Sequence, residues 1–255
     1  MGDESLKKIE ILKEFSLSEL DERIRKIRLK GFPEIEIYKD SNISIQEFSP
    51  EKIVSDIFTP QPRVYRTFID RINNMAKLFL EQGIDIFKLQ GGVDYLAIDD
   101  EGIKTEWTLI PPVVEVILIK FSEEGLDYED VIGEELKKRM LAEGHTLNEE
   151  LKKMWFEEFN KHLGLSNIKL ICDGSNRIHA AVEKGINQNL LVIDAPKKGF
   201  PYYAAPKPYS KVHVEAERID GSKSDKTHIL SEPGHKHLYR LFPSGGILSG
   251  DVRKD

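Results

Sequence analysis

Residues 168–193 read IKLICDGSNRIHAAVEKGINQNLLVI, and the interpretation of the whole chain starts from this stretch. Its first five residues suit a β-strand, and the polar segment 173–176 suits a tight turn. Apolar residues at helical spacing follow at Ile178, Ala181 and Val182. Gly185 is a helix stop signal, and the apolar run 190–193 predicts a second strand. The stretch therefore predicts a strand, a turn, a short helix and a strand.

The turn at residues 173–177 is a candidate anion site. The start of a helix presents backbone N–H groups without partners in the helix, together with the positive end of the helix dipole. Arg177 adds a guanidinium, whose planar donors match phosphate oxygens. Together these features suit a phosphate group.

The composition is that of a globular protein. Of the 255 residues, 40% are hydrophobic and 32% are charged, so we expect one domain with elaborations. No apolar run reaches the roughly 18 residues that a membrane-spanning helix needs, and the N-terminus lacks the apolar core of a signal peptide. Cys172 is the only cysteine, which excludes an intrachain disulfide. We expect a cytoplasmic protein.

The charge is unevenly distributed. The net charge of −7 argues against a surface that is basic throughout, but many Lys and Arg residues lie from Lys197 onward. Proline and tyrosine are frequent in the segment 199–209, which is therefore not helical. The extension 196–255 is either a solvated basic surface or a local contact for nucleic acid.

The N-terminal part predicts helices and short strands. Residues 4–30 carry two apolar stripes at helical spacing and predict two helices, as a cover for the core or as a homodimer contact. Alternation at 34–38 and 43–45 predicts strands, and Ser49 before Pro50 is a helix N-cap. We expect an N-terminal helical arm with a short strand over residues 1–42.

The middle of the chain alternates between a helix and strands. Residues 64–80 predict an amphipathic helix, followed by strands at 84–89, 93–98 and 103–109 with a hairpin turn at 99–102. The most apolar run, 109–119, predicts a central buried strand. Glu115 lies within it, and a buried carboxylate needs a partner, so Glu115 is either functional or reaches water at an edge.

A helical insertion is expected after this strand. Residues 128–141 carry the first helix, and a Thr146-x-x-Glu149 capping box begins the second. The insertion spans 122–165 within a core of residues 43–195.

Two segments resemble the ParB/sulfiredoxin-like superfamily. They are Thr59-Pro60-Gln61-Pro62-Arg63, similar to a first box of the form N-P-x-Q-P-R, and Asp173 to Ala180, similar to a second D-G-x-H-R box. The resemblance covers about residues 43–65, 103–119 and 166–193. It implies an α+β fold, with a small mixed β-sheet and flanking helices, that binds a nucleotide.

The resemblance also implies roles for individual residues. Gly174, Ser175, Asn176 and Arg177 would hold the phosphates of ATP or CTP. Asp173 would orient the turn or bind Mg²⁺, and Gln61 with Arg63 would border the nucleotide. Sulfiredoxins carry a cysteine where this chain has Ser175, so sulfinic-acid reduction is not expected.

Three functions remain open from the sequence. The first is a Mg²⁺-dependent NTPase or small-molecule phosphotransferase, in which Arg177 stabilises the transferred group and the base is Glu115, Asp173 or His179. The second is a nucleic-acid-binding protein or nuclease regulated by nucleotide. The third is a fold that has lost catalysis.

Overall fold

The computed structural model describes residues 6–59, 63–117, 121–122, 125–126, 168–194, 207–215 and 240–242. Over these residues the fold is a mixture of helices and small mixed sheets, and the α+β prediction is confirmed. The helices predicted for 128–141 and from Thr146 onward lie outside the described residues, while Ser122 and Gly125–Leu126, at the start of the expected insertion, belong to strands. None of the described helices is long and apolar enough to cross a membrane.

The largest sheet has six strands in the order β14-β5-β12-β9-β13-β4. Strands β5 and β12 run parallel, as do β9 and β13, and the other pairs are antiparallel. The prediction of a central buried strand is confirmed, because β9 lies inside the sheet and Val113 and Val114 are fully buried. The strands are Lys207–Pro208, Ile57–Thr59, Ile168–Asp173, Val113–Ile117, Gln188–Asp194 and Asn42–Phe48.

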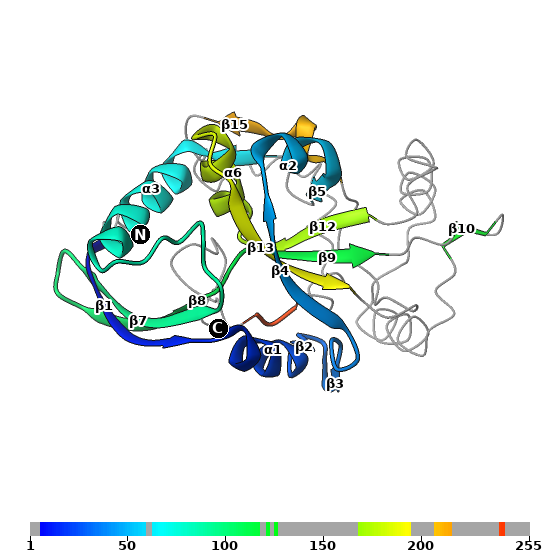
Figure 1. Cartoon of the computed structure of the whole chain (residues 1–255), viewed down its shortest axis with the longest axis horizontal. Coiled ribbons are helices and arrows are strands. Elements are labelled where there is room, and N and C mark those ends of the chain that lie inside the picture. The colour runs from blue at the N-terminus through cyan, green and yellow to red at the C-terminus, as the bar shows by residue number, and fades with distance from the viewer. Residues whose placement is uncertain are drawn as a thin grey trace, which may run out of the picture.

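Different helices cover the two faces of this sheet (Figure 1). Helices α2 (Pro50–Asp56) and α6 (Ser175–Glu183) pack on one face, where Ile53 and Ile178 meet Val114. Helix α1 (Leu17–Arg25) packs on the other face with Leu20 and Ile24. Alternate residues of β9 and β13 therefore enter separate apolar clusters. The predicted cap of α2 is confirmed, since Ser49 Oγ accepts from the N–H of Lys52.

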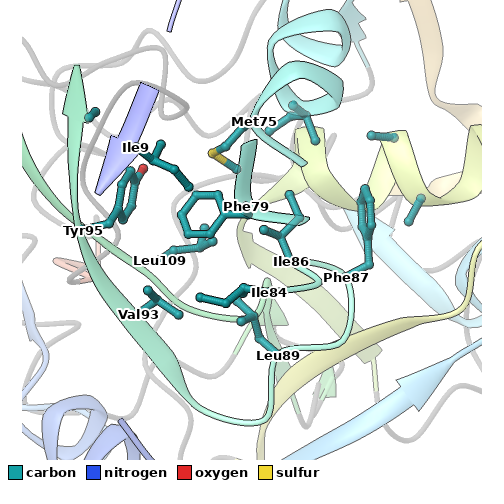
Figure 2. Close-up of a cluster of buried hydrophobic side chains, with 14 of the residues drawn as sticks. Ile9, Met75, Phe79, Ile84, Ile86, Phe87, Leu89, Val93, Tyr95 and Leu109 are labelled. Atoms are coloured by element: carbon teal, nitrogen blue, oxygen red, sulfur yellow. The ribbon is translucent and has the colours of Figure 1, made fainter. Parts of the chain in front are cut away.

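A second sheet and α3 enclose another apolar cluster (Figure 2). Helix α3 (Arg66–Glu81) confirms the helix predicted for 64–80. Phe79 is fully buried at its centre and meets Tyr95 edge to face at 4.9 Å between ring centroids. The sheet has the order β1-β7-β8, and β7 and β8 form the predicted hairpin. Its strands are Leu6–Phe15, Gly92–Asp99 and Lys104–Leu109.

The prediction of a helix at the start of the chain is wrong for residues 6–15, which form β1 against β7. The register shifts twice in this pairing, at Lys7 and at Leu12. Each bulge adds a residue to the two-residue repeat of a strand. As a result apolar residues fall three or four positions apart, as they do in a helix. The second predicted helix is confirmed as α1.

The strand predicted for 84–89 is also wrong, because these residues form a buried loop. Asp85 accepts from the N–H of Phe87 through its side chain, at 2.9 Å, and from the N–H of Lys88 through its carbonyl, at 3.0 Å. Such local bonds offer the backbone an alternative to a strand ladder. The apolar side chains of the loop still pack around Phe79.

The C-terminal extension contributes to the core at several places. Strand β14 pairs with β5, and β15 pairs in parallel with β6. Arg240 forms an isolated antiparallel β-bridge with Leu29. The remaining elements are β2 (Arg28–Leu29), β3 (Phe32–Glu36), β6 (Arg63–Tyr65), β10 (Phe121–Ser122), β11 (Gly125–Leu126), the 3₁₀ helix η1 (Tyr209–Lys211) and β15 (His213–Glu215).

Candidate functional site

The turn between β12 and α6 requires a glycine. Gly174 has φ of 77° and ψ of 23°, in the left-handed region. A Cβ atom at this position would lie 2.7 Å from Cβ of Pro112 and 2.9 Å from Nη2 of Arg177. Both the backbone conformation and the close packing therefore disfavour a side chain at this position. The predicted strand, turn, helix and strand are all confirmed in this stretch.

The backbone N–H groups in the first turn of α6 differ in whether they already have an acceptor. The N–H groups of Arg177 and Ile178 bond to the carbonyl of Gly174, at 3.0 and 3.1 Å. Ser175 and Asn176 are half-buried. Within the part of the chain that the structure describes, the N–H of Ser175 has no hydrogen-bond partner. The N–H of Ser175 is thus available to an anion.

The sheet brings the carboxyl ends of β5 and β12 to one edge. In the parallel pairing of β5 with β12, Ile57 lies opposite Lys169 and Phe58 opposite Leu170. The carboxyl ends of parallel strands lie at the same edge of a sheet. Thr59, the first residue of the first box, therefore lies beside the end of β12, where the second box begins. Gln61 and the side chain of Arg63 lie outside the described residues.

Arg177 is buried under the turn, with 3% of its surface exposed. Its Nη1 donates to the carbonyl of Ile110, and its Nη2 lies 3.7 Å from Oδ2 of Asp173. Burial lowers the pKa of Arg177, and the carboxylate of Asp173 opposes this shift. Because of these contacts, the guanidinium ties the turn to the residues that precede β9.

Asp173 ends β12 next to a register shift, and its side chain is half-buried. It is the carboxylate closest in sequence to the first turn of α6. Among the described residues, no group of three or more His, Cys, Asp or Glu side chains could hold a metal ion. A Mg²⁺ ion bound through Asp173 would have to take most of its ligands from phosphates and water, which is common for Mg²⁺.

Glu115 is buried and paired, on the face of the sheet away from α6. Val114 packs with α6, so the neighbouring Glu115 points to the α1 face, beside Tyr38. Arg240 donates to its carboxylate twice, from Nε to Oε2 at 3.3 Å and from Nη2 to Oε1 at 3.4 Å. The expected partner of the buried carboxylate is thus an arginine 125 positions later.

Two further side chains complete this network. The hydroxyl of Tyr38 donates to Oε2 of Glu115 at 3.1 Å, and the thiol of Cys172 donates to the same oxygen at 3.3 Å. Burial, together with the charge of Glu115, raises the pKa of Tyr38 well above its usual value. Sequence reasoning missed Tyr38, Cys172 and Arg240. The only signal was a glutamate within an apolar run, which called for a cation.

His179 contacts the C-terminal extension. Its Nδ1 lies 3.0 Å from the hydroxyl of Tyr209, which is buried. Burial lowers the pKa of His179 and raises the pKa of Tyr209. The structure thus brings together residues 173–177, while Glu115 lies on the opposite face and His179 is bonded to Tyr209.

Comparison with known proteins supports the resemblance to ParB-like proteins. The model of the family described as the ParB CE domain matches residues 19–143, nearly half of the chain. The matched residues include the first box and β9, and they end before the turn at 173–177. No curated protein and no solved structure matches the chain significantly. The family match, on an α+β fold with small mixed sheets, supports a ParB-like superfamily assignment.

Proposed function

We propose that the chain binds a nucleoside triphosphate, ATP or CTP, with its phosphates at the first turn of α6, and turns it over with Mg²⁺. The reaction is hydrolysis or transfer of a phosphoryl group to a small molecule. The observation that carries the proposal is the parallel pairing of β5 with β12. Because of this pairing, Thr59 at the beginning of the first box lies at the same edge of the sheet as the end of β12, where the second box begins. The assignment to the ParB-like superfamily adds support.

Each residue of the turn has a role in this proposal. The backbone N–H of Ser175 would bind a phosphate oxygen, with the helix dipole adding positive potential. Arg177 would hold the turn in shape through Ile110 and would contribute its charge from beneath. Such fixed donors stabilise a transferred phosphoryl group without having to reorganise during the reaction.

Asp173 is the favoured carboxylate for Mg²⁺ and for orienting the acceptor. Glu115 is bonded to Arg240 on the other face of the sheet, and His179 is bonded to Tyr209. Neither therefore competes with Asp173 for a place beside the phosphates. In this scheme Asp173→Asn retains nucleotide binding in the absence of Mg²⁺ and loses the Mg²⁺-dependent gain in affinity.

A thermal-shift screen is the first test. The protein is heated with ATP, CTP, GTP or UTP, with and without Mg²⁺, because a ligand of the native state raises the apparent stability. Any nucleotide that raises the melting temperature is then measured by calorimetry and by phosphate release. The absence of a shift with all four nucleotides would contradict the proposal.

A negative charge introduced at the turn should affect nucleotide affinity and folding stability in opposite directions. Ser175→Asp puts a carboxylate at the start of a helix, which favours folding by about 0.3–1 kcal/mol. The same carboxylate repels a phosphate, so we expect nucleotide affinity to fall at least about tenfold, or ~1.4 kcal/mol. Ser175→Ala keeps the N–H and should retain affinity. Gln46→Glu, an exposed site on β4, adds the same charge elsewhere and should change neither property.

Nucleic-acid binding is the second candidate. It is favoured by the position of the C-terminal extension, whose strands β14 and β15 pair with β5 and β6 beside the first box. The extension is basic. Retardation of DNA or RNA in a gel, weakening steeply with salt, would favour this function. Turnover of nucleotide in the absence of nucleic acid would favour the first.

A further inference from the structure

The segment Arg240–Phe242 contacts residues from the first half of the chain, more than 100 positions earlier. It lies between the six-stranded sheet and α1, drawn in red (Figure 1). The N–H of Leu241 donates to the carbonyl of Arg28 at 3.1 Å, and Arg240 bridges Leu29. The ring of Phe242 stacks on Tyr38, with 6.1 Å between centroids and 26° between planes. The segment therefore adds an isolated β-bridge to β2 and an aromatic contact to the α1 face.

The guanidinium of Arg240 is the part of the segment that reaches deepest. The side chains of Arg240 and Glu115 are each only 1% exposed, whereas Leu241 is 53% exposed. A carboxylate in an apolar cluster is costly without a compensating charge. Docking of the segment thus determines whether Glu115, at the centre of the sheet, carries a paired or an unpaired charge.

The network extends from Glu115 to the turn at the start of α6. Cys172 donates to the same carboxylate oxygen as Arg240, and the next residues in the chain are Asp173 and Gly174. The pairing of β12 with β9 shifts register between Ile171 and Asp173, so Cys172 lies at the bulge and has no Cα partner on β9. Its orientation depends on side-chain contacts more than that of a residue held by regular pairing.

We propose that Arg240–Phe242 is a latch that orders the 173–177 turn. With the segment docked, the paired carboxylate of Glu115 holds Cys172 and the end of β12, and the turn is ready to bind an anion. With the segment released, Glu115 draws in water, the thiol of Cys172 keeps only the carbonyl of Leu170 as an acceptor at 3.6 Å, and the turn loosens. The ordering of the turn is independent of any ligand. Its effect on affinity rests on the proposed nucleotide function.

The single cysteine provides a direct readout. Cys172 is half-buried, and its reaction with an aromatic disulfide reagent reports release of the segment. Amide hydrogen exchange over 173–178 reports order in the turn. We expect both rates to rise at least about tenfold in Arg240→Met, because a locally opened state becomes populated. Lys30→Met, an exposed lysine beside β2, is the matched control and should react and exchange like the wild type.

A milder variant covers the case in which Arg240→Met does not fold. Arg240→Lys keeps the charge and loses the two-pronged contact, so both rates should rise less. Unchanged rates in a folded Arg240→Met or Arg240→Lys protein would overturn the latch.

Nucleotide titration of the same proteins separates the two proposals. The latch predicts weaker binding in Arg240→Lys than in the wild type. Equal affinities would overturn the coupling. A wild-type protein that binds no nucleotide, combined with faster exchange at 173–178 in the variants, would overturn the proposed function and leave the latch in place.

Discussion

Replacement of Gly174 by alanine tests the geometry of the turn most directly. An L-residue in the left-handed region costs about 1–2 kcal/mol. The added Cβ would also lie 2.7 Å from Pro112 and 2.9 Å from Arg177, so the packing has to shift. Overpacking of this kind costs about 1–3 kcal/mol. Part of the loss is offset, by about 0.4–1 kcal/mol, because alanine restricts the unfolded chain.

Gly185, at the other end of α6, provides the matched control. Its φ is 66°, and a Cβ atom there would meet nothing within 4 Å. Gly185→Ala therefore carries the conformational cost without the clash, and we expect a loss of about 1 kcal/mol. For Gly174→Ala we expect about 2–4 kcal/mol, which corresponds to a melting temperature lower by roughly 5–15 °C.

The measurement is urea unfolding of both variants beside the wild type, followed by circular dichroism. The midpoint should fall more for Gly174→Ala while the slope stays constant, which indicates a loss of stability in the native state. Equal losses for the two variants would refute the close packing of the turn against Pro112. A larger loss for Gly185→Ala would refute the reasoning altogether.

Three further predictions follow from other parts of the fold. Arg240→Met should lower the free energy of unfolding by about 3–5 kcal/mol in chemical denaturation, because it leaves the charge of Glu115 unpaired. The double variant with Glu115→Leu should recover part of this loss. Additive losses from the two substitutions would contradict the pairing. His179 has a lowered pKa in the fold, so the unfolded state binds its proton more tightly and stability should fall as pH drops below about 6.5, less so in His179→Asn. Phe79→Ala should cost about 3–5 kcal/mol in thermal or urea unfolding, and a loss under 1 kcal/mol would argue against the cluster in Figure 2.

Local signals predicted α6 and its flanking strands well. Gly174 and Gly185 mark the two ends of the helix, and the apolar residues between them recur at helical spacing. Helix α3 and the cap at Ser49 were likewise predictable, because each depends on residues within a few positions. The errors at 6–15 and 84–89 arose where two bulges and the bonds of Asp85 altered a local pattern.

Long-range pairing could not be predicted from these signals. The sequence pointed to a partner for Glu115 and offered no means to choose Arg240 among the cations of the C-terminal extension. Similarly, the sequence predicted that Arg177 binds a phosphate, but it could not predict the hydrogen bond from Arg177 to the carbonyl of Ile110. That bond depends on the packing of α6 against the residues just before β9. Contacts between distant segments form only once the sheet is assembled. The sequence can therefore indicate that a buried charge needs a partner, but only the fold identifies the partner.

The placement of charge around the turn constrains how an anion could be held there. Arg177 is bonded to a backbone carbonyl and lies near Asp173, and Arg240 neutralises Glu115 on the other face. These two buried guanidiniums therefore already have acceptors. In the proposed function, the charge of a triphosphate would therefore be met by the N–H of Ser175, by a Mg²⁺ ion at Asp173 and by Arg63 of the first box. A site of this kind binds weakly without the metal, because helix dipoles supply only partial charges, about half an elementary charge at a helix end.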